Sequence, residues 1–203
     1  MTVNPTTAVS ASVVASQNPV CAGETVHFTL SYVNAGADPT IQWFKNGNLI
    51  QTGGLTYSYT PAHGDKISAQ VGSNNNCAAN NPANSNTITL VVTPTVQPTI
   101  TLSGPPEVLC NNIPVTITAI TTYAGSAPGF VWYLNGEVLP DVNGPAYSYL
   151  ARPGDKMKVQ LTSNHNCLSN NTVMSSELSI NVLQSAVAPT SVSSDKNNYC
   201  ANE

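Results

Sequence analysis

The composition of this chain is that of a folded protein with few charges. It has 203 residues, of which 8% are charged, and its formal net charge is −4 at pH 7. With only six Lys and Arg residues, no electrostatic interface with nucleic acid or with an anionic membrane surface is expected. Hydrophobic residues make up 41%, enough to build a core. No apolar run reaches the roughly 18 residues that a membrane-spanning helix needs.

The first half of the chain predicts a series of short strands. Apolar and polar residues alternate in "TVHFTLSY" at 25–32, "KISAQV" at 66–71 and "TITLVV" at 87–92, a period of two that is typical of half-buried strands. Between them, "WFKNGNLI" at 43–50 places Asn-Gly among apolar residues, which predicts a β-hairpin. Gly64-Asp65 predicts a turn before a strand. No stretch of useful length has a helical period.

The second half of the chain repeats the first. About 90 residues after each landmark of the first half an equivalent appears, a period far longer than that of a solenoid. Cys21, Trp43, Asn46-Gly47, Tyr57–Tyr59 and Cys77 recur as Cys110, Trp132, Asn135-Gly136, Tyr147–Tyr149 and Cys167. Cys200 continues the series after Cys110.

These intervals predict two complete domains in tandem. We expect an N-terminal tail at 1–7, repeats at 8–93 and 99–183, a proline-containing linker at 94–98 and the start of a truncated third repeat at 184–203. Many short strands with turn residues between them favour an all-β sandwich for each repeat. The N-terminal "MTVNPTTAVSASVV" lacks the pattern of a signal peptide, and the chain is interpreted as a fragment of a longer protein.

The landmark residues resemble those of immunoglobulin-like domains. A Trp follows the first Cys by about 22 residues and a second Cys comes about 35 residues later, as in that family. More narrowly, "NPVCAGETVHFTL", "QWFKNGNLI" and "YSYTPAHGDKISAQVGSNNNC" resemble the tandem Ig-like repeats of giant secreted adhesins of the Bacteroidota. Those include gliding-motility adhesins exported by the type IX system, and similar repeats serve as spacers in secreted enzymes.

Five cysteines in a chain with little charge indicate disulfides, because no Cys or His pair has zinc-ligand spacing. The simplest scheme pairs Cys21 with Cys77 and Cys110 with Cys167, leaving Cys200 unpaired. Yet Cys21 precedes one strand and Cys77 follows another that runs the same way in the Ig-like topology. A strand of eight residues spans about 25 Å, whereas a disulfide needs Cα atoms within about 7 Å. A bond between repeats, Cys21 to Cys167, is therefore the second alternative.

No enzyme is expected, because the chain contains no G-x-S-x-G, P-loop, G-x-G-x-x-G or H-E-x-x-H motif. His27 and His63 have no partner in the pattern. His165 and Cys167 could be a base and a nucleophile, but Asn75 replaces the histidine in the first repeat. Asp65 and Asp155 are equivalent turn residues of different domains, so they are not an acid–base pair.

No cofactor and no metal site are expected. The alternative is Ca²⁺ at the joints between domains, which Ig-like arrays use for stiffening. Calcium sites draw on several clustered oxygen ligands. The acidic residues nearest to such a set form no local cluster: Asp38, Asp65, Glu137, Asp141 and Asp155.

The aromatic residues divide into expected core and a candidate ligand face. Trp43 and Trp132 occupy the position where such sandwiches bury a Trp. Phe44 and Tyr133 follow them and should point the other way, so with Tyr123 they are candidates for stacking on a sugar. The partners expected are neighbouring repeats of the same polypeptide, and a polysaccharide, an abiotic surface or a host surface.

The resemblance implies a function outside the cell. It implies structural or adhesive stalk modules of a large repetitive adhesin at the bacterial surface, acting in gliding motility or surface attachment. The alternatives are a carbohydrate- or surface-binding module and the spacer region of a secreted hydrolase.

Overall fold

The computed structural model describes residues 5–105, 109–110 and 113–183, and the chain divides into two compact units, Met1–Thr95 and Val96–Glu203. No helix occurs in this described part of the chain, and in particular none that is long and apolar enough to cross a membrane. The expected third repeat and Cys200 lie outside the described residues.

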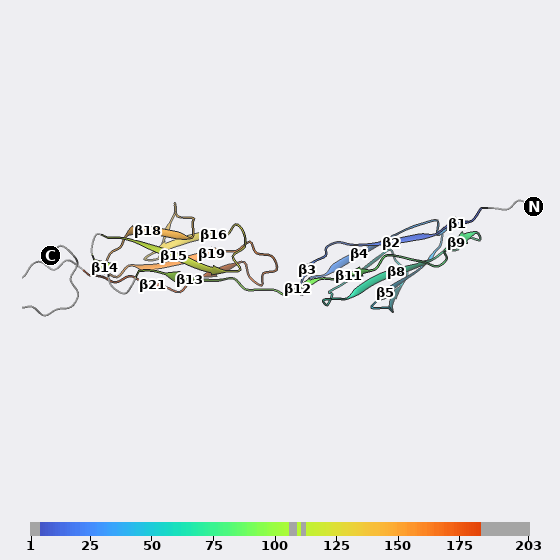
Figure 1. Cartoon of the computed structure of the whole chain (residues 1–203), viewed down its shortest axis with the longest axis horizontal. Helices are drawn as coiled ribbons and strands as arrows, with labels where there is room; N and C mark the ends of the chain where they lie inside the picture. Colours follow the sequence, from blue (N-terminus) through green and yellow to red (C-terminus); the bar gives the residue numbers. More distant parts are fainter. Residues whose placement is uncertain (1–4, 106–108, 111–112, 184–203) are drawn as a thin grey trace, which may run out of the picture. The chain divides into compact units, whose positions relative to one another are not determined.

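The first unit is a sandwich of two sheets (Figure 1). One sheet has the antiparallel order β2-β4-β7, formed by Ser10–Ala15, Val26–Val33 and Thr56–Tyr59. The other has the order β10-β8-β5-β6, with β11 also pairing β8; these strands are Ala83–Asn84, Lys66–Gly72, Thr40–Lys45, Asn48–Thr52 and Ile88–Thr89. Two short parallel pairs complete the unit: β1 (Thr7–Ala8) with β9 (Ala78–Ala79), and β3 (Val20–Cys21) with β12 (Val92–Thr93).

The second unit repeats this arrangement. Its first sheet, β13-β15-β18, contains Thr99–Ser103, Pro114–Thr122 and Ala146–Leu150. Its second, β17-β16-β19-β20 with β21 on β19, contains Glu137–Leu139, Gly129–Leu134, Lys156–Thr162, Thr172–Met174 and Leu178–Ser179. The strands β14 (Leu109–Cys110) and β22 (Val182–Leu183) pair in parallel, as β3 and β12 do. The predicted all-β class of tandem immunoglobulin-like sandwiches is confirmed.

Alternation of side chains places the core between the two sheets. In β4, Val26, Phe28 and Leu30 are buried and the residues between them are exposed. Strand β8 buries Ile67, Ala69 and Val71 in the same way from the facing sheet. Each unit has its own hydrophobic cluster. The period of two read from the sequence is therefore the packing pattern of the sandwich.

Both Asn-Gly pairs form the predicted hairpins. Strands β5 and β6 pair with Lys45 opposite Asn48, which leaves a loop of Asn46 and Gly47. These two residues have φ values of 52° and 82°, the left-handed backbone that a type I′ turn requires. Asn135 and Gly136 repeat the turn with φ values of 53° and 89°.

Candidate functional site

Cys21 and Cys77 lie at opposite ends of the first sandwich. Cys21 belongs to β3 and pairs with Thr93, next to the start of β4. At the far end of β4, Ala35 O accepts a hydrogen bond from the backbone N–H of Asn74, 3.2 Å away, in the loop that leads to Cys77. Figure 1 shows β3 and β12 at one end of this unit and β1 and β9 at the other. The strand between them spans about 25 Å.

The disulfide of the structure joins Cys21 to Cys167, and Cys77 is an exposed free thiol. The prediction that each repeat closes its own pair, Cys21 with Cys77 and Cys110 with Cys167, is wrong. The two cysteines of one repeat cannot bond because they lie at opposite ends of the sandwich. The length of the sandwich exceeds by severalfold the Cα separation of about 7 Å that a disulfide allows. The second alternative, the bond between repeats, is confirmed.

The backbone hydrogen bonds beside Cys77 and beside Cys167 are equivalent, although Cys167 itself has a φ of 58° and Cys77 lies outside this left-handed region. The carbonyl of Cys77 accepts a hydrogen bond of 2.9 Å from the N–H of Thr7, and the carbonyl of Cys167 accepts one of 2.9 Å from Val96. Thr7 and Val96 also bridge in parallel to the residue after each cysteine. The segment that enters each repeat therefore holds the cysteine-bearing loop of that repeat. Thr7 falls in the expected tail and Val96 in the expected linker.

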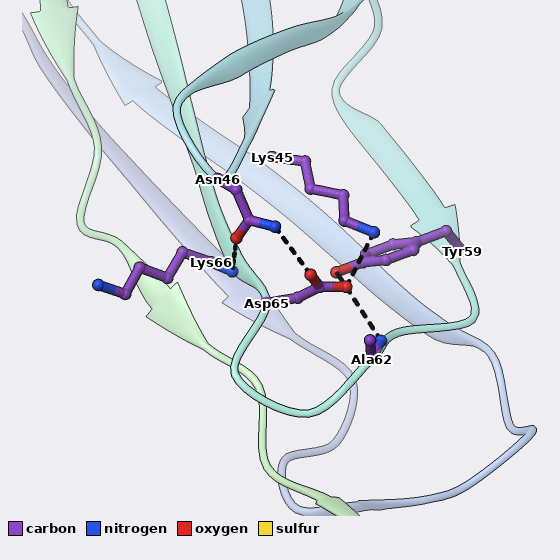
Figure 2. Close-up of polar contacts among 6 residues, drawn as sticks. All are labelled: Lys45, Asn46, Tyr59, Ala62, Asp65 and Lys66. Atoms are coloured by element: carbon purple, nitrogen blue, oxygen red, sulfur yellow. Dashed lines mark hydrogen bonds and ion pairs between the residues drawn. The ribbon is translucent and has the colours of Figure 1, made fainter.

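A second feature common to the repeats is a buried aspartate at the turn before β8 or β19. Figure 2 shows the first of these, the Asp65 cluster, made of Lys45, Asn46, Tyr59, Ala62, Asp65 and Lys66. Asp65 Oδ1 accepts a hydrogen bond from Asn46 Nδ2 at 2.9 Å, and Oδ2 accepts from Tyr59 Oη at 3.1 Å and from Ala62 N–H at 3.0 Å. Lys45 Nζ lies 2.8 Å from Oδ2 and 4.6 Å from the centre of the Tyr59 ring.

The contacts of Asp65 keep it ionised. Burial alone would raise the pKa of this carboxyl group, but the hydrogen bonds from Lys45, Ala62 N–H, Asn46 and Tyr59 outweigh that effect and hold it well below its ordinary value. The pKa of Tyr59 is raised, first by burial and then by the negative charge of Asp65. A charged carboxylate that accepts several hydrogen bonds in this way fixes the turn.

Sequence reasoning identified Asp65 as a turn residue but missed Lys45, Asn46 and Tyr59 as its partners. The signal that could have found two of them is the repetition itself. "NG" and "YSY" recur with "GD" in both halves: Tyr59 keeps its spacing to the aspartate, and the spacing of Asn46 changes by one residue, from 19 to 20. Lys45 carries no such signal, because Leu134 stands at its equivalent position.

The candidate catalytic residues are not brought together as an active site. His27 is exposed on β4, and His63 Nδ1 accepts a hydrogen bond of 3.2 Å from Val92 N–H. The ring centroids of His165 and Tyr123 lie 5.5 Å apart in a T-shaped arrangement, and the sulfur of Cys167 is engaged in the disulfide. Asp38, Glu137 and Asp141 are exposed, and nowhere in the described ranges do three His, Cys, Asp or Glu side chains gather as metal ligands do.

The aromatic residues occupy different environments. Trp43 and Trp132 are fully buried, and their Nε1 atoms donate to Gly54 O at 3.1 Å and Gly144 O at 2.9 Å. Of the candidate ligand face, Phe44 and Tyr133 are half-buried on β5 and β16, in different units. Tyr123 is 50% exposed and its ring contacts His165.

Comparison with known proteins adds only distant structural likeness. No protein-family model matches the chain, and no curated protein sequence does. Fibronectin(III)-like modules of Clostridium thermocellum CbhA match 90% of this chain and 100% of theirs, with 16% identity and a TM-score of 0.37. The ectodomain of mouse nectin-like molecule 4 (Ig1–Ig3) matches 91% of this chain and 66% of its own, with 12% identity and a TM-score of 0.35.

A third likeness is to the three N-terminal domains of the highly immunogenic outer capsid protein of bacteriophage RB49. It covers 86% of this chain and 59% of that one, with 10% identity and a TM-score of 0.42. Because all three TM-scores are low, the assignment of the fold rests on the sheets described above.

Proposed function

We propose that this chain is a pair of structural modules from the stalk of a repetitive extracellular adhesin, and that the covalent bond between its repeats is the feature on which that role depends. The observation that carries the proposal is the Cys21–Cys167 disulfide. A bond inside one domain would stabilise that domain only. A bond from one repeat to the next restricts how far the two can move apart, which is what a stalk requires.

Composition and cysteine chemistry support a location outside the cell. Disulfides persist in oxidising compartments and are rare in the reducing cytosol. A surface with so few charges suits a module whose partners are its own neighbours. The resemblance to type IX-exported gliding-motility adhesins extends the proposal to the bacterial surface, in motility or attachment. We propose no catalytic role for either repeat.

The experiment measures the spread of distances between the repeats. Spin labels are attached through unnatural amino acids at Thr29 and Thr118, equivalent exposed positions on β4 and β15, so that every native cysteine is kept. Pulsed electron resonance then gives the distance distribution of the oxidised chain and of a Cys21→Ser, Cys167→Ser double variant. We expect the distribution of the variant to be at least about twofold broader, because a cross-link removes conformations that a free linker allows.

Cys77→Ser is the matched control, since it removes a thiol that takes no part in the bond. Its distribution should equal that of the wild type. Equal widths for the wild type and the double variant would overturn the proposal, because the disulfide would then contribute nothing to the relation between repeats.

A further inference from the structure

We propose that Cys77 forms another disulfide between repeats, and that its partner is a cysteine equivalent to Cys21 in a further repeat. This inference rests on the proposed function and deepens it by naming the partner of an unassigned thiol. Cys77 is exposed and free. Its equivalent Cys167 is bonded to a Cys21 located one repeat earlier in the chain. In that bond, the loop cysteine of one repeat pairs with the Cys21-type cysteine of the repeat before it. The same pairing for Cys77 requires a cysteine of the Cys21 kind outside these two repeats.

The loop that carries Cys77 has the hydrogen bonds of the loop that carries the bonded Cys167. Besides the Thr7 and Val96 contacts, Asn74 N–H donates to Ala35 O and Asn164 N–H donates to Ala124 O, both at 3.2 Å. One residue further, Asn75 N–H donates to Ser73 Oγ at 3.0 Å and His165 N–H donates to Ser163 Oγ at 3.1 Å. The hydrogen bonds that hold this loop are therefore already formed around the free thiol, and the difference is confined to the cysteine, where Cys167 has a φ of 58° and Cys77 lies outside the left-handed region.

The position of the other cysteine of the bond, the Cys21 type, also recurs. Cys21 is held in the two-residue strand β3, paired in parallel with β12 and opposite Thr93. Cys110 takes the same place in β14, paired in parallel with β22 and opposite Leu183. Each repeat thus has one cysteine position at the edge of this short parallel pair and one in the loop before β9 or its equivalent. A series of repeats would carry one bond at every joint.

Cys77 cannot form this disulfide within its own repeat. The cysteine of the right kind in that repeat is Cys21, which is bonded and lies beyond the length of β4 from Cys77. The partner is therefore a Cys21-type cysteine on another repeat, supplied either by a longer form of the same polypeptide or by a second copy of this chain.

The bond forms by thiol–disulfide exchange with a low-molecular-weight disulfide such as oxidised glutathione. The Cys77 thiolate attacks one sulfur of the oxidant, forms a mixed disulfide and releases one glutathione thiolate. The thiolate of the incoming cysteine then attacks Cys77 Sγ and releases the second. Two protein thiols lose two electrons and two protons in total, and the oxidant is reduced to two thiols.

The first arm of the test supplies the partner on the same polypeptide. Residues 1–95 carrying Cys77→Ser, so that the added copy contributes no free thiol at that position, are placed directly before Thr7, which reproduces the sequence order at the joint. After equilibration in a glutathione buffer, peptide mapping without reduction should find Cys77 linked to the Cys21 of the added copy, together with the Cys21–Cys167 bond. Cys77 should at the same time lose its reactivity towards maleimide.

A matched control moves the thiol by one residue. In the extended chain, Asn76→Cys combined with Cys77→Ser keeps an exposed thiol in the same loop. We expect its bond to be at least about 100-fold less favourable against glutathione than that of Cys77, which corresponds to about 60 mV. If Cys77 stays reactive towards maleimide while the Cys21–Cys167 bond forms, the inference is overturned and the proposed function stands.

The second arm supplies the partner on another molecule and does not need the extended chain. Cys167→Ser in the 203-residue chain releases Cys21, which the sandwich keeps away from Cys77 of its own molecule. Oxidation at rising concentration should then give covalent dimers linked Cys21 to Cys77, and Cys167→Ser with Cys77→Ser should not give that linkage. Dimers of the unaltered chain linked Cys77 to Cys110, its other cysteine of the Cys21 kind, would identify a second copy as the source. Absence of the Cys21–Cys77 linkage in this arm would exclude a second copy as the source, and its absence from the extended chain refutes the inference.

Discussion

The two repeats build the same turn around a buried aspartate but surround it with different charges. Asn46 and Asn135 both donate to the aspartate at 2.9 Å, and both accept from the backbone N–H that follows it, at 2.8 and 2.9 Å. In the first repeat Lys45 adds an ion pair at 2.8 Å. In the second, Leu134 occupies that position. The shared contacts are therefore the ones that shape the turn, and the cation is an addition.

The tyrosine beside each aspartate reflects this difference. Tyr59 Oη donates to Asp65 at 3.1 Å. Tyr149 Oη is buried and has no hydrogen-bond partner among the residues that the structure describes. Burial, and next the charge of Asp155, raise the pKa of Tyr149. The first cluster thus hydrogen-bonds its tyrosine hydroxyl group, whereas the hydroxyl group of Tyr149 lies near Asp155 without a hydrogen bond of good geometry.

The largest expected effect tests whether the two cores are equivalent. Trp43→Ala and Trp132→Ala each remove a fully buried ring, and each should lower the free energy of unfolding of its own repeat by about 3–5 kcal/mol. Hydrogen exchange followed by mass spectrometry reads the two repeats separately as denaturant is added. If the free energy of unfolding fell less than half as much in one repeat as in the other, the two cores would not be equivalent.

The next effect tests the shared part of the turn. Asp65→Ala leaves the side chains of Asn46 and Tyr59 without their acceptor, and we expect a loss of about 3 kcal/mol from the first repeat. Asp155→Ala removes fewer contacts and should cost about 2 kcal/mol. Urea titrations measure both losses. If Asp155→Ala proved the more destabilising, the extra donors of the first repeat would have no energetic role.

A smaller effect tests the cation directly by exchanging the differing residue. Lys45→Leu should cost about 1 kcal/mol in the first repeat, because the lysine is partly exposed and its ion pair is screened. Leu134→Lys places an ammonium group near Asp155 and should recover up to about 1 kcal/mol in the second. Thermal unfolding at low and high salt checks the assignment. A gain in the second repeat that did not shrink with salt would speak against an ionic cause.

Acid should produce the smallest difference. Because the folded-state pKa of Asp65 is depressed, its ionised form stabilises the first repeat at pH values above the ordinary carboxyl pKa of about 3.9, and that contribution is lost as pH falls below it. We expect the Tm of the first repeat to fall between about pH 5 and pH 2, and Asp65→Asn to flatten this fall. A variant with the same acid dependence as the wild type would show that other groups dominate.

The sequence predicts strands and hairpins well because these depend on neighbouring residues. The alternation in β4 and β8 and the two Asn-Gly turns are local patterns, and the structure has them where expected. The parallel pairs β1–β9 and β3–β12 were not foreseen, since two-residue segments carry no period and their partners lie about 70 residues away.

The site was harder to predict than the fold. Pairing the two cysteines of each repeat is the simplest reading of the repeat, but the bond depends on the three-dimensional distance between the ends of a sandwich. Strand direction and strand length place Cys21 and Cys77 at opposite ends of the sandwich, which is why the bond between repeats forms instead. Lys45 was missed because its neighbour in space, Asp65, is distant in sequence and the second repeat offers no equivalent pair.

The Cys21–Cys167 bond also limits how far this chain can lengthen under tension. A pull applied at the two termini passes directly from one sulfur to the other, so the residues between Cys21 and Cys167 bear no load. Stretched out, those residues would add roughly 500 Å of contour length. The oxidised chain should therefore lengthen only through residues 1–20 and 168–203, and the length between the two cysteines is released only when a reductant cuts the bond.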